Sequence, residues 1–157
     1  MQSTRQNVTV LRAAINDSRD IWKWRNDELT KRMSILNEDI SWEAHSAWYQ
    51  NTLSNPNRYL YLGLINDIEK IGLCRFDIDT EISTAEVSIN LNPQYRGMRF
   101  SSKLLTAAIT KFCTERDTDL VATIRKANFA SIKCFTNSGF LFEYEDSQYN
   151  YYRRLAT

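Results

Sequence analysis

The sequence predicts a single α+β domain with a mixed, mostly antiparallel central sheet of about six to seven strands and helices on both faces. Three observations support this. The chain has 157 residues, which suffices for one domain, 1–157, and is too short for two. Hydrophobic residues make up 43% of the chain and the formal net charge is +1, as in ordinary globular proteins. Segments with strand and helix periodicity follow one another in the order β-α-α-β-β-β-α-β-α-β-β, and such a mixture favours a sheet covered by helices.

The N-terminal third is predicted to contain one strand and two helices. Residues 8–14 have strand character, and Asp17 can cap the first helix. The polar stretch 25–34 is compatible with a helix or a loop, and the sequence leaves the two open. Ser41 is an N-cap for a second helix at residues 42–53, which ends before an Asn-Pro-Asn turn.

The middle of the chain is predicted to form three strands. Residues 58–65 and 70–78 form a β-hairpin through a turn at Asn66-Asp67. Residues 86–92 alternate strictly between polar and apolar side chains, which indicates a strand with one polar face. Pro93 ends this strand.

The C-terminal third is predicted to alternate helices and strands. Residues 100–116 repeat apolar side chains at helical spacing. A short buried strand follows at 120–124, and a helix at 128–137 ends at a Ser-Gly pair. Residues 140–144 and 149–155 have the character of closing strands.

Composition excludes several classes of function. The four glycines are too widely spaced for a dinucleotide fingerprint or a Walker A loop, and they are Gly63, Gly72, Gly97 and Gly139. A single histidine, His45, excludes the two-histidine zinc motifs, and no metal site is expected. The near-zero net charge gives no electrostatic argument for nucleic-acid binding.

The cysteines and the N-terminal residues indicate in which cellular compartment the protein is expected. The three cysteines are odd in number and widely spaced, which fits reduced thiols rather than a disulfide framework. The N-terminus carries no apolar signal region, and no run of the sequence approaches the ~18 apolar residues of a membrane span. We therefore expect a cytoplasmic protein that does not interact with membranes.

Two motifs resemble those of the GNAT acyltransferases. The first runs from Asn92 to Leu105 and contains Pro93 and Arg96-Gly97, and it is similar to the acetyl-CoA motif R-G-x-G-x-G/A that opens an amphipathic helix. The second is the helix that begins at Asn128 and ends in Gly-Phe. With the order of elements, the resemblance covers about residues 7–155 and implies an acetyl-CoA-dependent N-acetyltransferase.

A helix N-terminus can hold the pyrophosphate of coenzyme A, because its backbone N–H groups are unpaired and carry partial positive charge. The resemblance implies binding of acetyl-CoA by the strand, the helix start and the second motif. These residues are Ile89, Asn90, Leu91, Arg96, Gly97, Met98, Arg99, Phe100, Ser101, Ser102, Asn128, Ser131 and Phe135. Arg99 and Ser101 depart from the family pattern by replacing glycine or a small residue, and Arg99 adds a Cβ and a charge at the phosphate site.

The predicted catalytic residues are Glu86, Ser88 and Asn128. In proteins that this chain resembles, the polar strand splays from its parallel neighbour and a backbone N–H polarises the thioester carbonyl. The backbone of residues 89–91 is the candidate donor. Glu86 is the candidate base that removes the ammonium proton, directly or through a water, and Asn128 is expected to orient the cofactor.

The proton donor for the departing thiolate stays open. Many relatives carry a tyrosine seven residues after the motif asparagine, where this chain has Phe135. The candidate hydroxyls are Ser88 and the four tyrosines of the closing strands, Tyr144, Tyr149, Tyr151 and Tyr152. The thiolate can also leave without an enzyme acid, because thiols are weak bases.

The N-terminal helices resemble those of nucleotide-sugar N-acetyltransferases, above all those acting on the 4-amino group of a UDP-linked sugar in pseudaminic acid biosynthesis. The shared pattern is W-R-N-D, a later arginine with a small residue, and I-S-W-x-x-H-x-x-W. It implies a substrate-binding set of Arg25, Asn26, Arg32, Met33, Ser34, His45 and Trp48. Arginine suits a diphosphate because its planar fork donates paired hydrogen bonds.

Three functional hypotheses follow. The first is acetylation of a nucleotide-linked amino sugar by direct attack in a ternary complex. The second is N-terminal acetylation of a protein, as in the ribosomal-protein acetyltransferases. The third is a non-catalytic acyl-CoA binding domain, which Arg99 and Phe135 favour. The resemblance also allows a homodimer.

Overall fold

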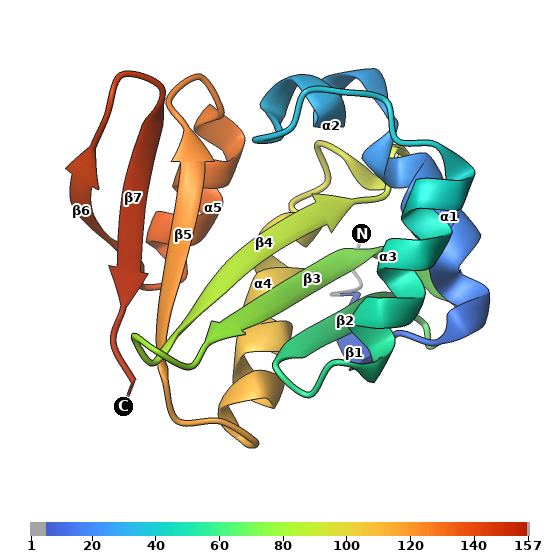
Figure 1. The fold of residues 1–157 in the computed structure, drawn as a ribbon, viewed down its shortest axis with the longest axis horizontal. Coiled ribbons are helices and arrows are strands. Elements are labelled where there is room, and N and C mark those ends of the chain that lie inside the picture. The colour runs from blue at the N-terminus through green and yellow to red at the C-terminus, as the bar shows by residue number, and fades with distance from the viewer. Residues whose placement is uncertain (1–5, 157) are drawn as a thin grey trace, which may run out of the picture.

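The protein is a seven-stranded sheet with helices on both faces, as the sequence predicts (Figure 1). The computed structural model describes residues 6–156. The strands are β1 (Val8–Arg12), β2 (Arg58–Ile65), β3 (Glu69–Asp79), β4 (Thr84–Leu91), β5 (Asp119–Arg125), β6 (Leu141–Glu145) and β7 (Tyr149–Arg154). The helices are α1 (Ser18–Arg25), α2 (Glu28–Met33), α3 (Trp42–Ser54), α4 (Phe100–Cys113) and α5 (Phe129–Asn137).

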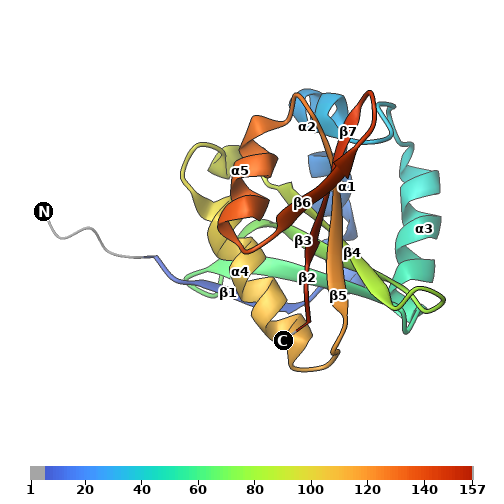
Figure 2. The ribbon, with the colours of Figure 1, turned by 90° about the vertical axis from the view of Figure 1, so that its left-hand side faces the viewer.

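Strand order in the sheet is β1-β2-β3-β4-β5-β7-β6. All neighbouring strands are antiparallel except β4 and β5, which are parallel. Helices α4 and α5 cover one face, and α1 and α3 cover the other (Figure 2). The parallel strands β4 and β5 lie in the interior of the sheet. Helix α4 connects them, because two parallel neighbours need a crossover connection.

The helix starts follow the capping residues in the sequence. Ser41 accepts a hydrogen bond from the Ala44 N–H at the start of α3, and Asn128 accepts one from the Ser131 N–H at the start of α5. Asp27 does the same for Thr30 and so begins α2, which resolves the open stretch 25–34 as the end of α1 and a separate short helix. The turn between β2 and β3 has positive φ at both Asn66 and Asp67, as a tight hairpin requires.

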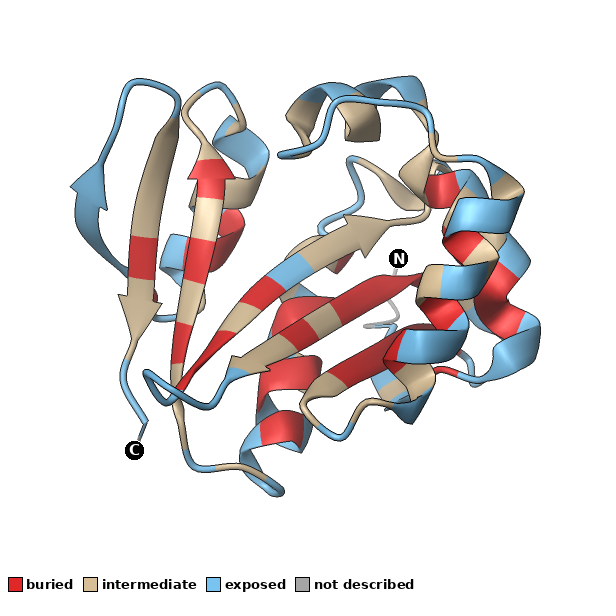
Figure 3. Ribbon diagram, in the orientation of Figure 1, coloured by how far each residue is buried: buried red, intermediate tan, exposed pale blue. Residues whose placement is uncertain are grey.

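Two hydrophobic clusters lie on opposite faces of the sheet. The larger joins the sheet to α4 and α5 and includes Tyr61, Phe76 and Leu104. The smaller includes Ile21, Trp24 and Tyr49 from α1 and α3, packed on even-numbered residues of β2. Strand β2 is buried along almost its whole length, β4 and β5 are buried only in part, and β6 is exposed at the sheet edge (Figure 3). None of the helices in residues 6–156 is long and apolar enough to cross a membrane.

Candidate active site

Strands β4 and β5 pair only at their first residues and then separate. The parallel register joins Thr84, Ala85 and Glu86 to residues 119–121, although β4 continues to Leu91 and β5 to Arg125. The two strands diverge towards α2 (Figure 1). This opening explains why a strand in the middle of the sheet carries polar side chains, because Glu86, Ser88 and Asn90 line the cavity that forms here instead of a packed interior.

The unpaired edge of β4 presents backbone groups to this gap. The Asn92 N–H donates to the Ile71 carbonyl of β3 at 2.8 Å, and the antiparallel register continues without a bulge along β4. Backbone groups of successive residues in such a strand point alternately to its two neighbours. Those of Asn90 therefore point to β3, and those of Ile89 and Leu91 point to the gap.

A cavity of roughly 390 Å³ occupies the opening between the strands. This volume falls in the range of small-ligand sites. Its walls come from β3, β4, β5, α5, the side chains of Arg25 at the end of α1 and Trp48 on α3, and the segment that follows α1. We call that segment, residues 27–40, the α2 segment. It closes the cavity at the divergent ends of β4 and β5.

The N-terminus of α4 follows the end of β4 through the loop 92–99. Gly97 and Arg99 both have positive φ, 73° and 62°, and Arg99 does not cap the helix with its side chain. The first-turn N–H groups of α4 have no partners within the helix. A Cβ at Gly97 would meet no atom within 4 Å, so this loop is open on the outside.

Glu86 lies in the cavity wall among other charged groups. Burial raises the pKa of Glu86 above its ordinary value, and Asp77 on β3 raises it further. A hydrogen bond with Thr123 and the charge of Arg75 act in the opposite direction. Arg75 itself forms a 3.0 Å ion pair with Asp77. Glu86 is thus a partly desolvated carboxylate whose pKa depends on charged and polar side chains of β3 and β5.

Arg25 contributes a second charge to the cavity. Its guanidinium carbon lies 4.5 Å from the centre of the Trp48 ring, and its Nη1 lies 3.2 Å from His45 Nδ1. Burial, together with the charge of Arg75, lowers the pKa of Arg25 to about 10, so the side chain remains cationic at neutral pH. Among residues 6–156, no carboxylate lies within ion-pair distance of Arg25. Its nearest hydrogen-bond partner is an uncharged imidazole.

Comparison with protein families identifies this arrangement. The family described as acetyltransferase (GNAT) domain matches residues 8–141. The chain belongs to the GNAT acetyltransferase family. Its members are acetyl-CoA-dependent enzymes, and the order of strands and helices predicted from the sequence is the fold of this family.

Solved GNAT structures superpose on nearly the whole chain. The spermidine N-acetyltransferase from Vibrio cholerae, in complex with CoA and spermine, has a TM-score of 0.81 at 16% identity and covers 94% of this chain and 93% of its own. A ribosomal L7/L12 α-N-protein acetyltransferase in complex with coenzyme A has a TM-score of 0.81 at 17% identity, with coverage of 96% and 94%. A domain from Methanocaldococcus jannaschii gives 0.81 at 19% identity, with coverage of 94% and 97%. Comparison with curated proteins finds no match.

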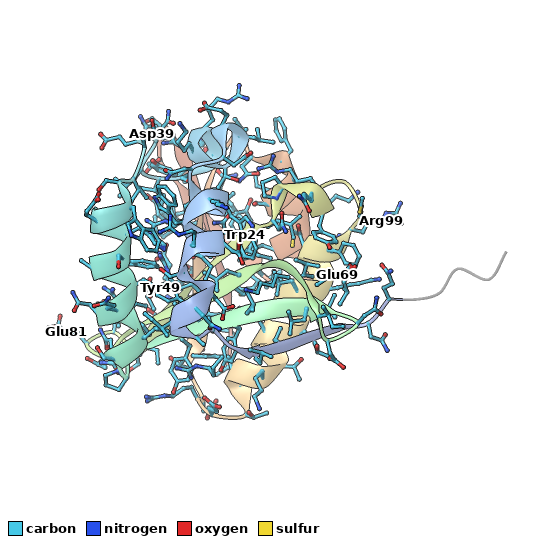
Figure 4. All side chains as sticks on the ribbon, turned by 90° about the vertical axis from the view of Figure 1, so that its right-hand side faces the viewer. Trp24, Asp39, Tyr49, Glu69, Glu81 and Arg99 are labelled. Carbon is cyan, nitrogen blue, oxygen red and sulfur yellow. The ribbon has the colours of Figure 1, made fainter. Side chains whose placement is uncertain are left out.

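The structure places about half of the predicted catalytic and cofactor residues in the wall of one cavity. The cavity wall contains Glu86, Ser88, Ile89, Asn90, Asn128, Ser131 and Phe135. Gly97, Met98 and Arg99 are exposed on the loop before α4, and the Arg99 side chain points away from the sheet (Figure 4). Leu91, Ser101 and Ser102 are half-buried, and Phe100 is buried. Arg96 is half-buried and turns its side chain to the α2 segment.

These residues fit coenzyme A. The gap between β4 and β5 offers the unpaired backbone of Ile89 and Leu91, and the start of α4 offers uncapped N–H groups beside an open glycine. Inside the gap, Asn90 Oδ1 is buried without a hydrogen-bond partner, so the wall retains an acceptor for a polar ligand. Asn128 uses its Oδ1 to cap α5, which leaves its amide nitrogen as its available polar atom.

The structure divides the predicted substrate-binding residues into two groups. Arg25, Met33, Ser34 and Trp48 line the cavity. Asn26 lies outside the cavity wall, because its side chain both donates to and accepts from the backbone of Ile40. Arg32 is exposed on the outside of α2. The four tyrosines proposed as proton donors also lie outside the wall, whereas Ser88 is part of it.

His45 is a buried structural residue rather than an acceptor contact. It is fully buried, its Nε2 lies 3.0 Å from the Ser18 carbonyl, and its ring stacks on Tyr49 at 5.7 Å. The carbonyl can only accept, so Nε2 carries the proton and Nδ1 accepts from Arg25. The expected contact fails because the ring of His45 points towards α1, while Trp48, three residues later, faces the cavity.

His45 should make the protein less stable at acid pH. Burial and the charge of Arg25 lower the pKa of His45 to about 4 in the folded state. In the unfolded chain histidine titrates near 6.5, so unfolding takes up a proton below that pH. The free energy of unfolding should fall by about 1–2 kcal/mol between pH 7 and pH 5 on account of His45. Urea titrations should show this loss reduced in His45→Gln, whose amide offers a donor and an acceptor in place of the two ring nitrogens, and an equal loss in both proteins would contradict the assignment.

Several wall residues were missed by sequence reasoning. Arg75, Thr123, Glu38 and Thr30 line the cavity, and Arg125 holds its rim. One signal was available for Arg75 and Asp77. They stand two residues apart in the otherwise apolar stretch 71–78 of β3, and two charges on one face of such a stretch indicate a polar site.

The loop before α4 provides a stability test. Arg99 adopts a left-handed conformation that costs an L-residue about 1–2 kcal/mol. A glycine avoids this cost, but its greater flexibility stabilises the unfolded chain and offsets part of the gain. Arg99→Gly should therefore raise the free energy of unfolding by about 0.5–1 kcal/mol. Gly97→Ala, at a similar φ, should lower it by about 1 kcal/mol. Urea unfolding followed by tryptophan fluorescence measures both, and shifts of the same sign would contradict this account.

Proposed function

We propose that this GNAT enzyme transfers an acetyl group from acetyl-CoA to the 4-amino group of a UDP-linked amino sugar, by direct attack in a ternary complex. The observation that carries the proposal is Arg25. Its cationic guanidinium belongs to the cavity wall, lies over Trp48 and faces no carboxylate within ion-pair distance among residues 6–156.

A half-buried cation without a counter-charge favours an anionic ligand, because the ligand restores the interactions that burial removes. A diphosphate can accept two hydrogen bonds from one guanidinium. A polyamine such as spermine, which the Vibrio cholerae enzyme holds, would place further positive charge beside Arg25 and Arg75.

Each step of acetyl transfer is assigned to particular residues of the chain. When bound, acetyl-CoA supplies the activated acetyl thioester. The N–H groups of Ile89 and Leu91 are directed into the gap and can polarise a carbonyl placed there. Glu86 accepts the ammonium proton of the acceptor, directly or through a water. Asn128 orients the cofactor from the start of α5, and Ser88 is the one predicted proton donor that belongs to the wall.

Release of coenzyme A from acetyl-CoA tests the acceptor. The protein is offered a UDP-4-amino sugar, spermidine and an N-terminal peptide in parallel, with UDP-N-acetylglucosamine as the nucleotide sugar that has no free amine. We expect saturable release with the UDP-4-amino sugar alone. Release with spermidine or the peptide instead would overturn the proposed acceptor. Tight coenzyme A binding without release from any amine would indicate a binding domain.

A further inference from the structure

The loop before α4 is tied directly to the α2 segment by Arg96. The Arg96 guanidinium forms an ion pair with the Asp27 carboxylate, and the same Nη2 donates to Thr30 Oγ1 at 2.8 Å. The paired side chains are 32% and 24% exposed, so the contact is largely shielded from water. Arg96 immediately precedes Gly97, and Thr30 lines the cavity, so one side chain bridges the proposed coenzyme loop and the opposite wall.

The surroundings of Asp27 favour its ionised form. Burial opposes ionisation of Asp27, but the hydrogen bonds from Arg96 and from the Thr30 N–H outweigh it and lower the pKa of Asp27 below its ordinary value. The carboxylate is therefore ionised at neutral pH. It caps α2 and binds Arg96 with the same oxygen, Oδ2, so the start of α2 and the guanidinium share one point of attachment.

Side-chain hydrogen bonds attach the α2 segment to the rest of the described structure at three places. At its base, Asn26 makes two 2.8 Å hydrogen bonds to the backbone of Ile40, whose carbonyl also accepts one from Trp22 Nε1 at 2.7 Å. At its middle, Arg125 at the end of β5 donates to the carbonyls of Ser34 and Ile35 at 2.7 Å and 3.2 Å. The third is Arg96. The segment contributes a large part of the cavity wall, namely Thr30, Met33, Ser34, Ile35, Leu36, Glu38 and Ile40.

We propose that Arg96 is a positioning residue that couples the coenzyme loop to the acceptor wall. Coenzyme A bound at the start of α4 orders the loop, the ordered loop holds the guanidinium, and the guanidinium holds Asp27 and Thr30 in place for the acceptor. The inference rests on the proposed coenzyme site, although not on the identity of the acceptor. Its consequence is that coenzyme A and the amine bind with positive cooperativity.

Hydrogen exchange tests the coupling without any acceptor. Saturating coenzyme A should slow deuterium uptake in residues 28–39 of the wild-type protein by about fivefold. The slowing should disappear in Arg96→Gln and in Asp27→Asn, since asparagine still caps a helix and removes only the charge. Lys23→Gln, an exposed cation on α1, is the control and should behave as wild type.

Calorimetry with coenzyme A separates the two possible failures. Absence of binding to the wild-type protein would refute the coenzyme site itself. Binding without slower exchange in residues 28–39 would refute the coupling and leave the site intact. Thermal unfolding of each variant shows whether it is folded before either measurement.

Steady-state kinetics give a second, independent measurement once an amine from the release assay is in hand. Arg96→Gln and Asp27→Asn should each raise the KM for that amine about tenfold with less than a twofold change in kcat, and the double variant should be no worse than either single one. Arg96→Lys should recover part of the effect, because an ammonium restores the positive charge opposite Asp27 but lacks the planar guanidinium that positions Nη2 for both Asp27 and Thr30. Additive effects in the double variant would overturn the proposal.

Discussion

Replacing Glu86 by glutamine is expected to lower kcat about 100-fold at neutral pH, the contribution typical of a positioned general base. The side chain keeps its size and can still bond to Thr123, but it can no longer accept a proton. Because Glu86 lies in the cavity wall with its carboxyl partly desolvated, the loss should fall on kcat rather than on folding. Stopped and continuous assays of coenzyme A release measure kcat for both proteins.

The pH profile gives the sharper form of this prediction. The pKa of Glu86 is raised by burial and by Asp77, so the wild-type enzyme should lose kcat as the pH falls through that raised pKa and the carboxyl becomes protonated. Glu86→Gln should lack this acidic limb. Asp77→Asn should move the limb to lower pH, because the negative charge that disfavours ionisation is gone.

Glu38→Gln is the matched control, since Glu38 is the other carboxylate in the wall. It should retain the limb. An unchanged pH profile in Glu86→Gln would remove Glu86 from the role of base, whatever the change in rate.

The second large effect is expected at Arg25. Arg25→Gln should raise the KM for a UDP-4-amino sugar about 10- to 100-fold, because charged hydrogen bonds in such a site contribute about 1.5–3 kcal/mol. The KM for acetyl-CoA should change little. Arg25→Lys should fall between, as an ammonium keeps the charge and loses the paired donors.

Arg32→Gln provides the comparison, because the sequence assigns both arginines to the diphosphate and only Arg25 lines the cavity. We expect less than a twofold change in KM for Arg32→Gln. Equal effects at the two positions would contradict the proposal that the diphosphate of the acceptor binds at Arg25. Since Arg25 also contacts His45, urea unfolding of Arg25→Gln shows how much of its effect is structural.

Much of the fold was predictable because its signals are local. Ser41 and Asn128 cap the helices that they precede, the alternation of residues 86–92 marks β4, and the helical spacing after Arg99 marks α4. The GNAT resemblance also rests on contiguous motifs, and the family comparison bears it out. The exception is the short α2, whose six residues are mostly polar and which is held by Arg96 at Thr30 and by Arg125 just beyond its end.

The site was predictable only where neighbouring residues determine it. The sequence alone determined the order of elements, the family, and the strand and helix starts that border the coenzyme site. Tertiary structure decided where β4 and β5 stop pairing, that Arg25 faces the cavity and Arg32 faces outward, and that His45 is buried beside a lining Trp48. It also brought Arg96 to Asp27, 69 residues away. The physical reason is that periodicity and capping act within a few residues, whereas the direction of a side chain into a core or a cavity depends on elements that pack from distant parts of the chain.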